Sequence, residues 1–144
     1  MSAADCVICR GPAGDAELDR ELVWEDPLWR LTTSLRASVV GFSYLEPRRH
    51  IPYVADLDGE EAATFGVRLA AAARLLRDET GAEFVWALVF GEHVPHFHVN
   101  LAPRRVGDAL LAEPVLVDPE VPKPGRHEHE AVVARLRRSA AERF

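Results

Sequence analysis

The sequence predicts an α+β fold in which a mostly antiparallel sheet of five strands packs with two helices. Two segments show the apolar spacing of amphipathic helices, and five short segments have the composition and length of strands. Along the chain they run as three strands, a long helix, two strands and a C-terminal helix. A length of 144 residues suits one domain, so we expect residues 1–144 to form a single unit.

The first three strands are expected in the N-terminal third of the chain. Two short segments, Glu21–Asp26 and Trp29–Thr33, are joined at Asp26-Pro27, which is a turn signal. A third segment, Val39–Glu46, is ended by Pro47, which cannot donate to a sheet ladder. The sequence therefore predicts two strands joined by a turn, followed by a third strand.

A long helix is expected next. Asp58 is a favourable first cap, since its carboxylate can accept hydrogen bonds from the free amides of the first turn, and Glu61 completes a capping-box pattern. Apolar residues then recur every three or four positions up to Thr80-Gly81, where the helix is expected to end. The predicted apolar face consists of Phe65, Leu69, Ala72, Ala73 and Leu76.

The C-terminal part is expected to hold two strands, a loop and a helix. Phe84–Phe90 is apolar almost throughout, which is typical of a strand buried on both faces, and His96–Ala102 follows as the fifth strand. Residues 103–126 contain five prolines and predict a long loop. Residues 127–144 predict a helix from about Glu128 to Glu142. Its inward-facing residues are expected to be Val132, Val133, Leu136 and Ala140.

The composition argues against several classes of protein. Hydrophobic residues make up 48% and charged residues 28%, which is ordinary globular usage rather than that of a disordered chain. No apolar run approaches the roughly 20 residues that span a bilayer, and the first residues lack a secretion signal, so we expect a cytoplasmic protein without a membrane partner. A net charge of −6 disfavours a nucleic-acid partner.

The two cysteines, Cys6 and Cys9, form a Cys-x-x-Cys pair. In a reducing compartment such a pair is more often a metal knuckle or a redox couple than a structural disulfide. Arg-Gly-Pro follows directly, which favours zinc over a thioredoxin-type couple. Zinc would need two further ligands, usually histidines. Two small buried cysteines are the alternative interpretation. The histidines of the chain are His50, His93, His96, His98, His127 and His129.

The segment His96-Phe-His-Val-Asn100 carries the strongest chemical signal. Side chains alternate along a strand, so His96, His98 and Asn100 should project from one face, while Phe97, Val99 and Leu101 supply the core from the other. Polar groups gathered on one face need partners if they are buried. Satisfied core or surface histidines are the alternative to a functional site. His127 and His129, at the start of the last helix, are expected to be solvated.

Several segments resemble the histidine triad family of nucleotide hydrolases and transferases. The family signature alternates three histidines with apolar residues and often continues with Pro-Arg. The resemblance extends from Cys6 to about Arg104, and the matched segments stand in the family's order. In chain order they are Val23-Trp24-Glu25-Asp26, Pro47-Arg48-Arg49-His50-Ile51, Ala55-Asp56-Leu57 with Glu60-Glu61, and His96-Phe97-His98-Val99-Asn100-Leu101-Ala102-Pro103-Arg104.

The resemblance implies roles for individual residues. Zinc-containing members would place a structural Zn²⁺ on Cys6, Cys9, His50 and His96, which is a closed set of two thiolates and two imidazoles. The middle histidine, His98, would attack the α-phosphorus of a nucleotide or of a dinucleoside polyphosphate-like molecule and form a nucleotidyl-histidine. The resemblance also implies a homodimer, and an exposed edge strand would need such cover.

The sequence departs from the family pattern at three positions. Asn100 replaces the third histidine and can donate to phosphate but cannot carry a charge. His93 stands where many members have Ser or Thr, so it is a candidate for the phosphate contact and for general acid catalysis, with a solvated loop residue as the alternative. Ser34 stands at the position of a ribose-binding Asp or Asn.

Glu92 also stands in the expected substrate site, where it would be unfavourable near phosphate unless Arg104 or Arg105 offsets its charge. Three hypotheses remain. The chain is a zinc-stabilised enzyme that acts through His98, a nucleotide-binding module without catalysis, or a structural protein held together by zinc. Retention of both His96 and His98, with Pro103-Arg104, favours the enzyme over the binding module, although zinc binding alone would also explain His96.

Overall fold

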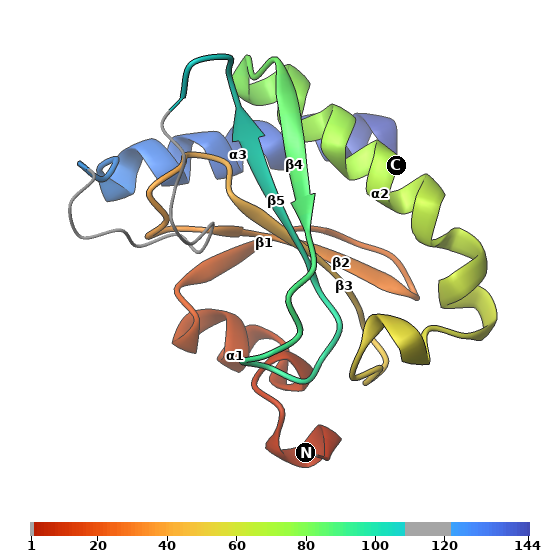
Figure 1. Cartoon of the computed structure of the whole chain (residues 1–144). Helices are drawn as coiled ribbons and strands as arrows, with labels where there is room; N and C mark the ends of the chain where they lie inside the picture. Colours follow the sequence, from red (N-terminus) through yellow and green to blue (C-terminus); the bar gives the residue numbers. More distant parts are fainter. Residues whose placement is uncertain (1, 109–121) are drawn as a thin grey trace.

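The computed structural model describes residues 2–108 and 122–144 (Figure 1). Short 3₁₀ turns and one short helix precede the sheet, and two long helices complete the fold. The elements are η1 (Ala3–Asp5), η2 (Ile8–Arg10), α1 (Pro12–Glu17), β1 (Arg20–Glu25), β2 (Trp29–Ser34), β3 (Ser43–Pro47), η3 (Val54–Asp56), α2 (Gly59–Thr80), β4 (Phe84–Leu88), β5 (Val99–Arg104) and α3 (Arg126–Arg143).

The five strands form one antiparallel sheet in the order β1-β2-β3-β5-β4. Helices α2 and α3 lie together along the sheet, and the N-terminal segment with α1 lies at the opposite end of the view in Figure 1. The α+β architecture predicted from the sequence is therefore confirmed. β1 and β4 are the edge strands.

Alternation along the strands separates an apolar face from a polar one. Leu31, Leu45, Val99 and Leu101 are buried in the main core together with residues of α2 and α3. The predicted core role of Phe97, Val99 and Leu101 is confirmed, since each is at most 3% exposed. The intervening residues of the central strands form the other, more polar face of the sheet, and the N-terminal segment packs near it.

A network of four buried charges lies on this polar face. Arg20 donates to both oxygens of Glu46, at 2.9 and 2.7 Å, and to Asp15 at 2.9 Å. Arg30 also contacts Asp15 and Glu46. All four residues are at most 6% exposed, so the charges are compensated by one another rather than by water. Through Asp15 the network ties α1 to the sheet.

Several predicted strand boundaries were wrong. β3 begins at Ser43 rather than Val39, because residues 39–42 turn at Gly41, where φ is +81°. β4 ends at Leu88, and its side chains are half-buried or exposed rather than buried on both faces, since it is an edge strand. β5 begins at Val99 rather than His96.

The predicted capping of α2 was also wrong. The helix begins as expected after Asp58 and ends before Gly81, which adopts a left-handed conformation with φ of +71°. However, the Asp58 carboxylate makes no cap hydrogen bond. Asp58 and Glu61 both contact the guanidinium of Arg49 instead. The two carboxylates therefore anchor the segment before His50 to the start of α2.

Helix α3 confirms the predicted inward residues, which are all at most 5% exposed. The expectation for His127 is confirmed, but His129 is 1% exposed and was wrongly predicted to be solvated. It lies one turn before the buried residue Val133 on the inward side of the helix. Most of the predicted 103–126 loop, residues 109–121, lies outside the described residues. Within the described part, no helix is long and apolar enough to cross a membrane.

Candidate functional site

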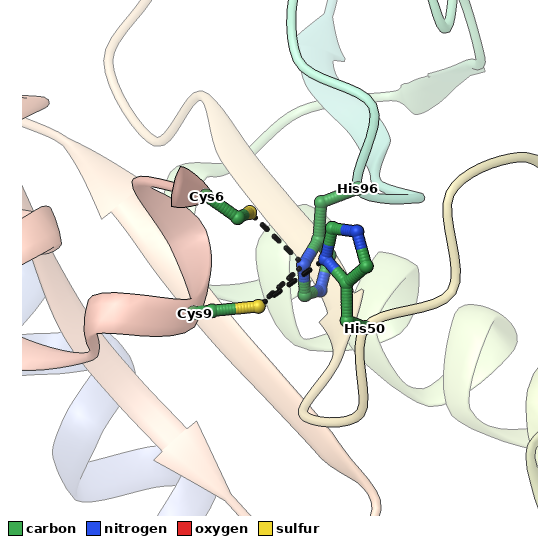
Figure 2. Close-up of side chains that lie close together, drawn as sticks. All are labelled: Cys6, Cys9, His50 and His96. Carbon is green, nitrogen blue, oxygen red and sulfur yellow. Dashed lines mark hydrogen bonds between the residues drawn. The ribbon is translucent and has the colours of Figure 1, made fainter. Parts of the chain in front are cut away.

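Four residues far apart in the sequence form one cluster, as predicted: Cys6, Cys9, His50 and His96 (Figure 2). Their candidate ligand atoms all lie within 4.8 Å of one another. Cys6 follows η1, Cys9 lies in η2, His50 follows β3, and His96 precedes β5. The cluster therefore joins the N-terminal segment to the loops at one end of the sheet.

The geometry of the cluster fits a zinc ion. The Nδ1 atom of His96 lies 3.4 Å from both cysteine sulfurs, and the Nδ1 atom of His50 lies 3.3 Å from the Cys9 sulfur. A tetrahedral ion with Zn–S bonds of about 2.3 Å and Zn–N bonds of about 2.0–2.1 Å separates sulfur from nitrogen by about 3.5 Å. The donor set and its spacing are thus compatible with zinc.

The protonation of His96 also suits metal binding. Its Nε2 atom lies 2.7 Å from the Pro47 carbonyl oxygen, which can only accept, so Nε2 carries the proton and Nδ1 keeps a lone pair toward the sulfurs. Burial lowers the pKa of His96 to about 4, which keeps the ring neutral. Burial, with the neighbouring Cys6 and Glu46, raises the pKa of Cys9 to about 12 when no cation is present. A bound cation would offset that cost for the thiolate.

The N-terminal segment reaches the cluster because η2 and α1 pack closely. Gly14 of α1 is buried against the backbone of Val7, and a Cβ atom at Gly14 would lie only 1.8 Å from the Val7 carbonyl oxygen. No other residue type fits this contact without movement of the backbone. The contact fixes the turn that carries Cys9.

His98 lies next to the cluster but faces a different space. Its Nδ1 atom lies 2.7 Å from the carbonyl oxygen of His96. The carbonyl can only accept, so Nδ1 carries the proton and Nε2 keeps its lone pair. In this tautomer, Nε2 is the nitrogen that can act as a nucleophile.

The cavity beside His98 has a volume of about 260 Å³ and a mainly apolar lining. Ile8 and Leu18 contribute from the N-terminal segment, and residues 90–94 contribute from the loop after β4. Tyr44 of β3 forms part of the floor, with its ring centroid 6.3 Å from that of His98. Such a concave apolar space with a few polar groups is typical of a small-molecule site.

The cavity contains four of the predicted site residues: His98, Asn100, His93 and Glu92. Asn100 is 4% exposed and its Nδ2 atom donates to the Leu88 carbonyl at 3.3 Å, which leaves one amide hydrogen for a ligand. His93 and Glu92 are exposed on the loop after β4. The structure thus brings together His98 and the three residues expected to surround its substrate.

Two predicted substrate contacts do not line this cavity. Ser34 is 2% exposed, and its Oγ atom accepts hydrogen bonds from the backbone of Arg36 and Ala37 at 3.1 and 3.0 Å. Arg104 is 4% exposed, and its guanidinium lies over the Trp86 ring at 4.5 Å, beside a separate cavity. Arg105 borders that separate cavity too, so neither arginine offsets Glu92 as the sequence analysis required.

Three polar residues of the cavity were missed from the sequence: Arg20, Arg36 and Tyr44. Arg20 and Tyr44 lie in β1 and β3 on the face of the sheet away from the core residues Val23 and Leu45. Alternation predicts such a face but does not show what its residues contact. Arg36 lies in the connection between β2 and β3, where the sequence has no periodic pattern.

Known proteins resemble this chain in their structures but were not matched by its sequence. No family model matches the sequence, and no curated protein matches it. Among solved structures, a hypothetical histidine triad nucleotide-binding protein from Sulfolobus tokodaii strain 7 has a TM-score of 0.73 at 18% identity, covering 95% of this chain and 93% of that one. A histidine triad protein from Bradyrhizobium japonicum has a TM-score of 0.70 at 24% identity, with 85% and 92% covered.

A third solved structure bears on the metal centre. A zinc-bound histidine triad family protein from Mycobacterium smegmatis has a TM-score of 0.70 at 22% identity, covering 98% of this chain and 99% of that one. At such identities the likeness establishes the fold. The chain has the fold of histidine triad proteins, as the resemblance of its motifs implied.

Proposed function

We propose that this chain is a histidine triad protein that hydrolyses or transfers nucleotides by attack of His98 on the α-phosphate. The observation that carries the proposal is the hydrogen bond from His98 Nδ1 to the His96 carbonyl, 2.7 Å long, in a ring that borders the cavity. It leaves the Nε2 lone pair as the nucleophile. The shared fold with structures described as histidine triad proteins supports the same assignment.

The chemistry follows from the position of that proton. Nε2 attacks the α-phosphorus, the bond from phosphorus to the leaving group breaks, and the leaving group departs with the bonding electrons. The ring becomes a cation, and its Nδ1 hydrogen remains bonded to the His96 carbonyl, which stabilises the charge. Water, or another acceptor, then attacks the same phosphorus and breaks the bond to Nε2. Asn100 and His93 are the donors in the cavity for the phosphate oxygens.

A zinc ion would be held by Cys6, Cys9, His50 and His96. With four protein ligands it would be a closed, structural site that pins the N-terminal segment to the sheet. His96 would serve as a ligand through its side chain while its backbone carbonyl orients His98. The metal therefore has a positioning role in this proposal, and the chain's own residues carry the reaction.

Turnover of a fluorogenic adenosine phosphoramidate tests the proposed function. The wild-type protein should release the fluorophore, and mass spectrometry of a quenched reaction should detect a nucleotidyl adduct on the peptide that contains His98. His98→Ala should lose both signals while its melting temperature stays within a few degrees of wild type. His127→Ala, at an exposed histidine outside the cavity, is the matched control and should remain active. Equal activity in His98→Ala would refute the proposal.

Elemental analysis tests the metal assignment separately. Protein purified without added metal should contain about one zinc per chain, and a strong chelator should lower its melting temperature, since metal binding stabilises the folded state. Cys9→Ser should reduce the zinc content. Less than a tenth of an equivalent, with no effect of the chelator, would contradict the assignment.

A nucleotide-binding module without catalysis is the second candidate. Asn100 carries no charge, and Glu92 places a carboxylate in the cavity without an ion pair in residues 2–108 or 122–144. Both features weaken the stabilisation of a developing negative charge. Binding of nucleotides by the wild-type protein without adduct or turnover would favour this candidate.

A further inference from the structure

Ser34, which the sequence analysis assigned to the ribose, has a structural task instead. Its Oγ atom accepts from the backbone amides of Arg36 and Ala37, and the residue is 2% exposed. A serine that bonds to the backbone two and three residues later folds a local turn. The turn after β2 therefore has a fixed shape, and the residue it presents at the cavity is Arg36.

Arg36 differs from the other arginine of the cavity, Arg20. Arg20 is 4% exposed and its guanidinium is bonded to Glu46 and Asp15. With Arg30, the buried part of that network contains two positive and two negative charges, and the exposed Glu25 also contacts Arg30 at 3.4 Å, so the network has no positive charge left over. Arg36 is exposed, and in the part of the chain that the structure describes its guanidinium has no hydrogen bond or ion pair. Among the described residues, no carboxylate is bonded to this arginine of the cavity.

The position of Arg36 within the cavity separates it from His98. His98 precedes β5, and Arg36 follows β2, with β3 and its residue Tyr44 between the two strands. Two strand spacings amount to about 10 Å across the sheet. Since β2 and β5 run parallel, the end of β2 and the start of β5 are also offset along the strands. Arg36 and Tyr44 both line the cavity, and the Arg20 guanidinium lies 5.5 Å from the centroid of the Tyr44 ring. A ligand whose phosphate lies at His98 would extend across Tyr44 toward Arg36.

Glu92, on the loop after β4, is a second charged residue of the cavity that makes no ion pair within residues 2–108 and 122–144. This loop is adjacent to the segment that carries His98, whereas Arg36 belongs to the connection at the other side of β3. The Glu92 carboxylate therefore repels an anionic group of a ligand on the loop side of the cavity, whereas Arg36 attracts such a group on the Tyr44 side.

We propose that Arg36 binds a second anionic group on the nucleoside half of the substrate, so that the preferred ligand carries negative charge beyond the phosphate attacked by His98. This inference rests on the proposed function and names its substrate class: a nucleotide with an additional phosphate, or a comparable anion, on its ribose. A guanidinium offers paired donors that match phosphate oxygens. Arg36 is then a specificity residue, and His98 remains the catalytic one.

Binding of two sets of three nucleotides, measured by calorimetry, tests the proposal. The probes are the 5′-monophosphates of adenosine and uridine and the corresponding ribose 2′,5′- and 3′,5′-bisphosphates. The wild-type protein should bind at least one bisphosphate about tenfold or more tightly than its 5′-monophosphate, which is the scale of one charge-assisted interaction. In Arg36→Gln this preference should disappear while the affinity for the 5′-monophosphates changes less than about twofold. Arg36→Lys should keep part of the preference.

The control is Arg74→Gln, which removes the same charge from an exposed position of α2 outside the cavity. It should leave every affinity unchanged. Equal binding of monophosphates and bisphosphates by the wild-type protein overturns the proposal, while turnover of the phosphoramidate through His98 would still support the proposed function. Equal weakening of all probes in Arg36→Gln also overturns it, because Arg36 would then contact the phosphate that all of them share. If no nucleotide binds, both the proposed function and the role of Arg36 are refuted.

Discussion

His96 and His98 are two positions apart in the sequence, yet one side chain lies in the cysteine–histidine cluster and the other borders the cavity. The Nδ1 atom of His96 faces the cysteines, whereas His98 borders the cavity. The link between them is the backbone, since the His96 carbonyl accepts the Nδ1 proton of His98. A change at the metal centre is therefore expected to reach the proposed nucleophile through one hydrogen bond, without any contact between the two rings.

His93 provides the first prediction at this scale. It borders the cavity and is exposed, so it can reach a phosphate without breaking an existing contact. If it contacts the phosphate in place of the missing third histidine, His93→Ala should reduce turnover about 10²-fold, the effect of losing one preorganised donor. Steady-state rates with the fluorogenic phosphoramidate measure this loss.

The double change shows whether His93 and position 100 share one task. His93→Ser should lose activity, and His93→Ser combined with Asn100→His should recover it, since an imidazole would again be available to the phosphate. The zinc content should stay constant in both, because neither residue belongs to the metal cluster. An unchanged rate in His93→Ala would identify His93 as an ordinary loop residue.

Among the elements, α1 determines where the cysteines lie. It contacts η2 through Gly14 and the sheet through Asp15, so the chain from Cys6 to Arg20 behaves as one packed segment. None of these residues belongs to the core cluster shared by α2 and α3, although Asp19 makes an ion pair with Arg126 of α3 at 2.9 Å. The segment is therefore held by one close backbone contact, the buried charges, this ion pair and the proposed metal.

Gly14→Ala tests the importance of that close contact. The added methyl group would lie 1.8 Å from the Val7 carbonyl oxygen, so α1 and η2 must separate. Overpacking of this kind costs about 1–3 kcal/mol of the free energy of unfolding. Chemical denaturation should show this loss, and elemental analysis should show a reduced zinc content.

Gly66→Ala is the matched control for this prediction. A Cβ atom at Gly66, in the middle of α2, meets nothing within 4 Å. Alanine is the better helix former by about 0.5–1 kcal/mol, so this variant should be equally or more stable. If both variants behaved alike, the contact between Gly14 and Val7 would have no special role.

For the molecule as a whole, His129 links stability to pH. It is 1% exposed between α3 and the segment around Ala37, and neither ring nitrogen makes a hydrogen bond of good geometry within the described residues. Burial lowers the pKa of His129 below its ordinary value, and the Ala37 backbone and the Glu128 and Asp19 charges oppose the shift only in part. The folded protein therefore prefers the neutral ring.

The sign of the pH effect follows directly. The unfolded chain binds the proton more tightly, so the stability is fully present above about pH 6.5 and falls as the pH drops toward the lowered value. Between pH 7.5 and 5.5, wild type should lose more of its free energy of unfolding than His129→Leu. Urea denaturation at both pH values measures the two losses. Since both proteins have the same metal cluster, the difference belongs to His129, and equal losses would contradict the assignment.

The edge strand β4 bears on assembly. Its residue Phe84 is 39% exposed, and Val89 and Phe90 directly after it are 44% and 46% exposed. Unpaired strand edges with apolar side chains favour association with another chain. We predict a homodimer, which sedimentation at tens of micromolar should detect as a mass about twice the 16.0 kDa of one chain. A mass near one chain would contradict this prediction.

The sequence by itself determined the order of the five strands and the two long helices, but not the short helix α1. Alternation and helical spacing are local properties, so they predicted the sheet, the faces of α2 and α3, and the core residues Phe97, Val99 and Leu101. The cluster of Cys6, Cys9, His50 and His96 was predicted through the resemblance to the histidine triad family, because the Cys-x-x-Cys pair alone left the two further ligands open.

Only the tertiary structure decided which side chains share a space. The surroundings of three residues depend on how the chain packs. Arg104 lies over Trp86 rather than in the cavity, and Ser34 bonds to its own turn rather than to a ligand. His129 is buried rather than solvated. The importance of Arg36 also depends on packing, because Arg20 is neutralised by Glu46 and Asp15. Burial and charge compensation are properties of the packed chain, and no local pattern encodes them.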